Sequence, residues 1–350
     1  MQPNIFEIGT KELHQDTFLT WLLQWGDPSN QQYNDALHKC GQAFIKWLIG
    51  MKYDNPASAI TKVKSDRQWN YIDVWAEVHT EETKYFIIIE DKVHATVHGN
   101  QLKDYLDHCM SHCQQEGFLP VPIYLKTGNE PAHVLQSIRE EGYITVIRKD
   151  LLHFLESHKQ VQNDIFDDFK KRLSKLESAN QAFLTLPPQQ WTGDCWIGFY
   201  QYLEEHLPWV KWHYVNPPNG EGFWNACLSW EQWQEYPVYV QIEQGPFCFK
   251  ISTDPEDVDI PENTTPSQVR NAWFKILIEA AKHKGFTEIR KPDRFGTGKY
   301  MTVALIEQES WLGTSDQLID LAQVVKRLHD YKQFLVSCIQ SCTAVEEATS

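Results

Sequence analysis

The chain has 350 residues, of which 42% are hydrophobic and 13% aromatic, and this composition excludes a disordered protein and favours two globular domains. Its 32 basic and 47 acidic residues give a formal net charge of -15, which excludes a surface that attracts phosphate everywhere, so any contact with nucleic acid must be local. Residues 1–176 carry 19 basic and 24 acidic side chains and residues 177–350 carry 13 and 23, so the N-terminal half is the more suitable surface for a polyanion.

The N-terminal stretch MQPNIFEIGTKELHQ lacks the basic segment and apolar core of a secretory signal. No later apolar run approaches the roughly 18 to 20 residues that span a bilayer. The 8 cysteines are scattered along the chain, which favours reduced thiols over a disulfide framework. We therefore expect a cytoplasmic protein with no membrane partner.

The first elements predicted along the chain are two helices and a strand pair. Thr10 is a plausible N-cap for a helix whose apolar residues recur with helical spacing until the turn GDPSN, and ALHKCGQAFIKWLIG predicts a second helix. The segments YIDVWAEVH and KYFIIIE predict two strands joined as a hairpin by a polar turn. The unbroken apolar run 86–89 is typical of a central strand that is covered on both faces.

The next elements are a helix, two strands and a helix. A helix is expected from about His98, followed by a strand in VPIYLKTG, and then by a strand and a helix in YITVIRKDLLHFLES. This order predicts an α/β sandwich around a mixed sheet, which would occupy residues 1–178.

The segment LESANQAFLTLPPQQ, around residues 176–190, reads as the passage between two domains. Beyond it, four short aromatic segments separated by turn signals predict an antiparallel sheet, and two helical patterns with a strand between them follow. Residues 190–350 are therefore expected to form a smaller α+β domain, with a role in substrate selection, partner contact or oligomerisation.

Three charged residues end the most apolar strand. Because side chains alternate along a strand, Glu90 and Lys92 should face one side and Asp91 the other. The hairpin would bring Asp73 of the preceding strand beside Glu90. Two adjacent carboxylates repel each other unless a cation lies between them, and Mg²⁺ prefers such oxygen ligands. The arrangement suits metal-dependent hydrolysis of phosphodiesters, with the lysine offsetting charge that grows on the phosphate.

An Asp on one strand, an acid-x-Lys at the end of the next and a helix that opens with Gln, here YID, IIIEDK and NQLKDYL, resemble the PD-(D/E)XK nuclease superfamily. The first helix, ELHQDTFLTWLL, resembles that of a bacterial branch of this superfamily. The resemblance covers roughly residues 5–175 and implies a restriction-endonuclease-like core. It also implies a Mg²⁺- or Mn²⁺-dependent nuclease acting on nucleic acid, with DNA as the expected substrate, in defence or DNA processing.

The resemblance also implies roles for individual residues. Asp73, Glu90 and Glu12 would be metal ligands, and Lys92 the catalytic lysine. Gln101 would position the water or a phosphate, and Tyr105 would line the cleft. The sequence departs from the family at Gln15 and Asp16, where the family's first helix often shows His-Ser. This departure leaves Asp16 as the alternative to Glu12 for the acid that faces the site.

Two other hypotheses about function stay open at this point. One is a catalytically silent module that keeps the fold and binds nucleic acid or protein. The other is an acidic surface that docks a basic protein partner, which is compatible with either activity or its loss. The sequence leaves the oligomeric state open, and a homo-oligomer is compatible with it.

Three further features have an ordinary structural interpretation beside a functional one. In HCMSHC the pairs His108/His112 and Cys109/Cys113 lie one helical turn apart, but the two pairs are rotated from each other, which favours core packing over a metal site. The basic loop 291–299 is either a phosphate-facing loop or a solvated one. Exposed aromatic residues of the second domain could stack bases, although such residues more often form a core; the candidates are Trp209, Trp212, Trp224, Trp230 and Trp233.

Overall fold

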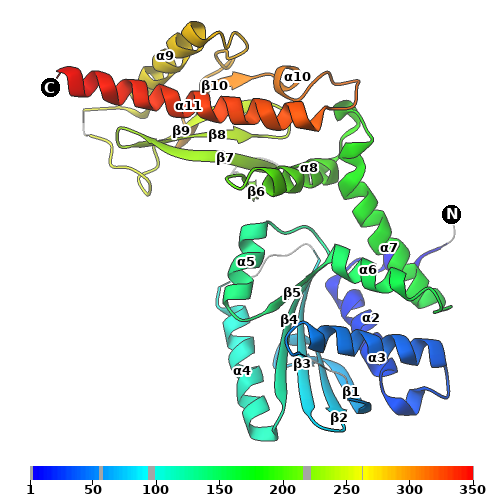
Figure 1. The fold of residues 1–350 in the computed structure, drawn as a ribbon. Helices are drawn as coiled ribbons and strands as arrows, with labels where there is room; N and C mark the ends of the chain where they lie inside the picture. The colour runs from blue at the N-terminus through cyan, green and yellow to red at the C-terminus, as the bar shows by residue number, and fades with distance from the viewer. Residues whose placement is uncertain (1–2, 55–57, 94–98, 216–221, 262, 350) are drawn as a thin grey trace. The chain divides into compact units, whose positions relative to one another are not determined.

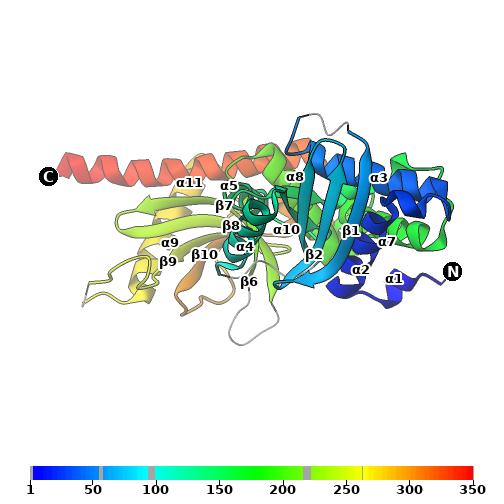
Figure 2. The ribbon, with the colours of Figure 1, turned by 90° about the horizontal axis from the view of Figure 1, so that it is seen from below.

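The computed structural model describes residues 3–54, 58–93, 99–215, 222–261 and 263–349, the last seven of these by their backbone only (Figure 1; Figure 2). Its contacts divide the chain into two compact units, Met1–Ser178 and Ala179–Ser350. Among the described residues, no helix is long and apolar enough to span a membrane.

The first unit is built on a five-stranded sheet in the order β1-β2-β3-β4-β5. The pairs β1–β2 and β2–β3 are antiparallel, whereas β3–β4 and β4–β5 are parallel. The prediction of a mixed sheet with a central apolar strand is therefore confirmed. The strands are β1 (Ile60–Trp69), β2 (Ile72–Thr80), β3 (Lys84–Lys92), β4 (Leu119–Lys126) and β5 (Ile144–Ile147).

Helices cover both faces of this sheet, with α4 and α5 on one side and α2 and α3 on the other (Figure 1). The alternation of β3 divides its apolar run between two cores: Ile87 and Ile89 pack with the α2 side, and Phe86 and Ile88 with the α4 side. The helical segments are α1 (Ile5–Ile8), α2 (Glu12–Trp25), η1 (Pro28–Asn30), α3 (Asp35–Gly50), α4 (Gln101–Glu116), α5 (Ala132–Glu140), α6 (Arg148–Ser157) and α7 (Asp164–Gln181).

The first unit differs from the sequence expectation at several points. Helix α5 lies between β4 and β5, where the sequence predicted no helix. Strand β1 was not expected, because its sequence ITKVKSDRQW is mostly polar and it forms the sheet edge, where few of its side chains are buried. The helix expected from about His98 begins at Gln101 in the structure, and His98 itself lies outside the described residues.

The second unit is an α+β domain whose five strands are all antiparallel, in the order β10-β9-β8-β7-β6. Residues of α8, α9, α10 and α11 pack on one face of the sheet and form its core. Phe183 is buried in this core, so part of the passage 179–189 packs with the second unit. The elements are η2 (Ala182–Leu184), η3 (Pro188–Gln190), α8 (Gly193–His206), β6 (Lys211–Val215), β7 (Phe223–Trp233), β8 (Tyr236–Ile242), β9 (Phe247–Ser252), α9 (Pro266–Lys284), β10 (Tyr300–Ile306), α10 (Gln308–Trp311) and α11 (Leu321–Thr349).

Candidate active site

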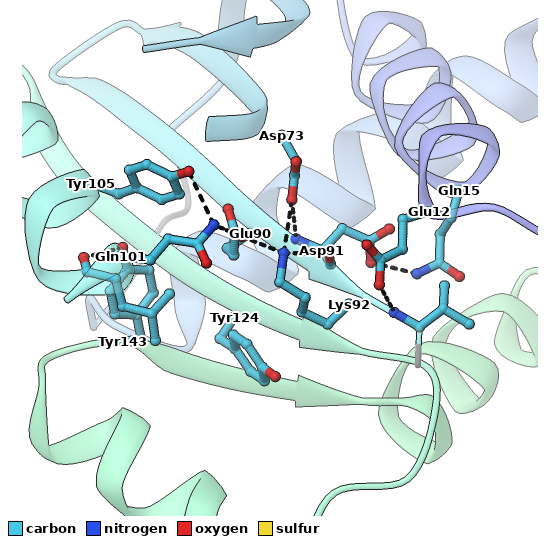
Figure 3. A network of polar contacts seen from close by, with 12 residues as sticks. Glu12, Gln15, Asp73, Glu90, Asp91, Lys92, Gln101, Tyr105, Tyr124 and Tyr143 are labelled. Carbon is cyan, nitrogen blue, oxygen red and sulfur yellow. Dashed lines mark hydrogen bonds and ion pairs between the residues drawn. The ribbon is translucent and has the colours of Figure 1, made fainter. Parts of the chain in front are cut away.

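The end of β3 brings together three of the predicted site residues. Val74 of β2 pairs with Ile89 in an antiparallel register, which places Asp73 beside Glu90. The Nζ atom of Lys92 lies 2.5 Å from Glu90 Oε1 and 3.7 Å from Asp73 Oδ2 (Figure 3). Two carboxylates and an ammonium group therefore converge at this end of the strand.

The first turn of α4 adds Gln101 and Tyr105 to this cluster. Gln101 Nε2 donates a hydrogen bond of 2.9 Å to Glu90 Oε1 and one of 3.0 Å to Tyr105 Oη (Figure 3). The two residues are four positions apart on the helix, so they lie on one face. The amide of Gln101 thus fixes one oxygen of Glu90 and links it to the phenol of Tyr105.

Burial controls the electrostatics of the cluster. Glu90 is only 1% exposed, and burial followed by repulsion from Asp73 raises its pKa to about 8. Burial also raises the pKa of Asp73, against the opposing effect of Lys92. Although burial acts to lower the pKa of Lys92, Glu90 and Asp73 outweigh it and raise that pKa, so Lys92 is held as an ammonium ion. Glu90 Oε2 is buried and receives no hydrogen bond from any described residue.

Asp91 points to the opposite side of the strand, where it contacts residues of helix α2. Gln15 Nε2 donates a hydrogen bond to Asp91 Oδ1, and Thr127 Oγ1 donates one of 2.8 Å to Gln15 Oε1. Asp16 lies against Asp91, and desolvation by burial is the largest effect that raises the pKa of each carboxyl group, to about 7 for Asp16 and well above its ordinary value for Asp91. Since Asp16 Oδ1 and Asp91 Oδ2 are reached by no described donor, one proton shared by the pair satisfies both groups.

Glu12, the first residue of α2, accepts a hydrogen bond of 2.9 Å from the backbone N–H of Val93, immediately after β3 (Figure 3). It therefore reaches the same strand end as Asp73 and Glu90. Within the described ranges, however, no group of three or more His, Cys, Asp or Glu side chains is arranged to hold a metal ion. The ligand roles of Glu12, Asp73 and Glu90 stay predictions.

Sequence reasoning predicted the neighbouring strand β4 but missed the polar residues at its end, which join the same edge of the sheet. Glu90 and Lys92 of β3 are paired in register with Tyr124 and Lys126. Lys126 is 1% exposed and its Nζ lies 3.0 Å from Glu130 Oε2, which also accepts a 3.1 Å hydrogen bond from Tyr124 Oη. The available signal was the segment IYLKTG, because the ends of adjacent parallel strands meet at one edge of a sheet.

The helical motif HCMSHC is structural. Cys109 and Cys113 are buried in the core under α4, and His112 packs against the rings of Trp69 and Phe86. His108 is exposed. This agrees with the interpretation of these residues as core and surface positions.

The basic loop 291–299 already has partners within the second unit. Lys299 Nζ lies 2.9 Å from Asp254 Oδ1, and Lys291 lies over the ring of Phe295. Arg270 Nη1 donates a hydrogen bond of 2.5 Å to the carbonyl of Gly296. Lys291 and Lys299 therefore both have contacts within the second unit.

Two of the five Trp candidates for base stacking, Trp212 and Trp233, are buried in the core of the second unit. Trp209 and Trp224 are partly buried and pack against this core. Trp230 differs, because it is 52% exposed and its ring stacks on Tyr239 with centroids 4.6 Å apart.

A mixed sheet whose central strand ends in an acid-x-Lys, beside an Asp of the adjacent strand and a helix that begins with Gln, defines a restriction-endonuclease-like domain. Residues 3–165 match the family model described as the PD-(D/E)XK nuclease superfamily. No curated protein and no solved structure gives a significant match to the chain.

Proposed function

We propose that the protein is a Mg²⁺- or Mn²⁺-dependent nuclease that hydrolyses phosphodiester bonds of nucleic acid, with DNA as the expected substrate. The observation that carries the proposal is the buried cluster of Asp73, Glu90 and Lys92 at the end of a central strand, within a region that matches the family model of the PD-(D/E)XK nuclease superfamily. A role in defence or DNA processing follows only from the resemblance to restriction-type enzymes.

The residues present fit a hard divalent cation. Glu90 Oε2 is buried without a donor from any described residue, and the nearby carboxylate of Asp73 raises the free energy of charging Glu90. Mg²⁺ is commonly held by one or two carboxylates together with water and substrate phosphate, so Asp73 and Glu90 are a sufficient protein contribution. Such an ion, when bound, activates water and neutralises charge on the phosphate.

The remaining side chains have roles that follow from their contacts. Lys92, held as an ammonium ion, can donate a hydrogen bond to a phosphate oxygen on which negative charge grows in the transition state. Gln101 orients the carboxylate of Glu90 through its 2.9 Å hydrogen bond, which leaves Tyr105 beside it to contact the substrate. Glu12 braces the strand end through the backbone of Val93.

A calorimetric titration with Mn²⁺ tests the metal site. The full chain is compared with Asp73→Asn and Glu90→Gln, with the exposed turn residue Glu81→Gln as a matched control. Each titration is repeated with inorganic phosphate, which supplies the oxygen ligand that a substrate would provide. We expect binding by the wild type and the control and its loss in both site variants. Equal binding by all four proteins, or none by the wild type in either condition, would contradict the proposal.

A further inference from the structure

A cavity of about 710 Å³ lies between the end of α6 and the middle of α7, away from the carboxylate cluster. Its lining includes the ammonium groups of Lys159, Lys170 and Lys171, and Glu156 is the one acid among the lining residues. Uncharged or weakly basic groups complete it, namely His153, Ser157 and Ser174. We refer to this cavity as the lysine groove. It is a basic site on a chain whose formal net charge is -15.

The lysines of α7 form a line of charge along the helix. Lys171 and Lys175 are four positions apart, so they lie on one face about 6 Å apart along the axis. Lys171 also borders a neighbouring cavity of about 540 Å³, whose lining includes Lys175 together with the acids Glu7 and Asp168. Lys175 forms an ion pair with Glu7 there. The positive charge is therefore concentrated in the lysine groove, where three lysines face one acid.

The present partners of these lysines are weak competitors. Lys170 Nζ lies 2.8 Å from Asp167 and Lys171 Nζ 4.0 Å from Asp168, both pairs being three positions apart on α7. Surface ion pairs of this kind contribute roughly 0 to 1 kcal/mol, so a phosphate can displace the carboxylates. Lys159 is exposed and forms no ion pair with any described residue.

The groove is fixed to the same framework as the candidate active site. Phe169 of α7 stacks on Phe18 of α2 with centroids 3.9 Å apart. Arg148, at the start of α6, donates hydrogen bonds of 2.8 Å to Glu177 of α7 and to the carbonyl of Thr127 after β4. Both helices that form the groove are thereby tied to elements that carry site residues.

We propose that the lysine groove binds the phosphodiester backbone of nucleic acid at a position separate from the carboxylate cluster. The identity of the polyanion rests on the proposed function, whereas the preference for phosphate rests on the lining. Lysine ammonium groups contact phosphates without reading bases, so the groove adds affinity that does not depend on sequence. Binding to these lysines releases counterions from the phosphates, and this release is less favourable at higher salt. The affinity that the groove contributes must therefore fall steeply as the salt concentration rises.

Fluorescence anisotropy of the full chain with a labelled 20-base-pair DNA duplex, in EDTA so that no cleavage occurs, tests the inference. The triple variant Lys159→Gln/Lys170→Gln/Lys171→Gln is compared with Lys39→Gln/Lys62→Gln/Lys84→Gln, which removes the same charge from exposed positions elsewhere in the first unit. Circular dichroism establishes that both variants are folded. Affinities are measured between 50 and 200 mM salt. The slope of log K against log salt concentration, called the salt slope below, changes by about 0.9 for each phosphate that the protein contacts.

We expect the groove variant to bind at least about 10-fold more weakly at the lowest salt and its salt slope to fall by about 2 to 3, with the control close to wild type. Equal losses in the two triple variants, an unchanged groove variant, or a wild type that binds no duplex would overturn the inference. Failure of the proposed function gives a different pattern: the wild type would bind the duplex through the groove and yet cleave nothing when Mg²⁺ or Mn²⁺ is added.

Discussion

Replacing Asp16 by Asn should make the first unit more stable above neutral pH and remove much of the pH dependence of its unfolding. Burial raises the pKa of Asp16 from an ordinary value of 3.8 to about 7. The folded state therefore retains a proton that the unfolded chain has lost, and stability present below about pH 4 disappears as the pH rises to about 7. Asn cannot ionise, and its amide can donate a hydrogen bond to Asp91.

The size of the effect follows from the shift. One pKa unit corresponds to about 1.4 kcal/mol, so a shift of this size has an upper limit of about 4 kcal/mol. Because Asp16 and Asp91 titrate as a pair, part of this free energy belongs to Asp91. We therefore expect Asp16→Asn to gain about 2 to 4 kcal/mol relative to wild type at pH 8 and little at pH 4.

Urea unfolding of the full chain in EDTA, followed by circular dichroism between pH 4 and pH 8, measures this difference. Asp107→Asn, at an exposed position of α4, is the matched control because it removes one carboxylate without affecting the buried pair. The curves of wild type and control should fall together with rising pH, and that of Asp16→Asn should stay flatter. Parallel curves for all three, or a variant less stable than wild type at pH 8, would refute the assignment of a shared proton to this pair.

Three other outcomes follow from the contacts. Lys92→Met should lower plasmid cleavage about 100-fold or more, because it removes a hydrogen-bond donor to the transition state. The far-ultraviolet circular dichroism should stay native. Cleavage close to the wild-type rate would exclude a catalytic role for Lys92. Gln101→Ala should weaken Mn²⁺ binding about 10-fold by calorimetry, since it releases the oriented oxygen of Glu90, and unchanged affinity would show that this orientation is unimportant. Arg148→Met should cost about 3 to 5 kcal/mol in urea unfolding because it removes the buried guanidinium that lies 2.8 Å from Glu177 Oε2, and a loss below about 1 kcal/mol would contradict that role.

The part of the site on β3 and β2 could be predicted because short-range rules determine it. Strand alternation places Glu90 and Lys92 on one side, and a hairpin with a short turn brings Asp73 beside them. The segment NQLKDYL likewise predicts that Gln101 and Tyr105 share a helical face.

The environment of Asp91 could not be predicted, because it depends on packing between segments far apart in the chain. The sequence indicates that Asp91 points away from Glu90 but not what covers it. The structure places Gln15 and Asp16 there, two residues that the sequence marked only as a departure from the family pattern. Strand β1 was missed for a related reason, since an edge strand buries few side chains and leaves little apolar signal.

Cleavage of a labelled DNA substrate as Mg²⁺ is added tests the central claim most directly. The full chain is compared with Glu90→Gln, which keeps the shape of the side chain but removes its charge, and with Glu81→Gln as the exposed control. We predict cleavage by the wild type and the control that begins with added metal, stops with EDTA and is absent in Glu90→Gln. Cleavage that persists in Glu90→Gln, or that proceeds equally well in EDTA, would contradict a metal-dependent nuclease site at the end of β3.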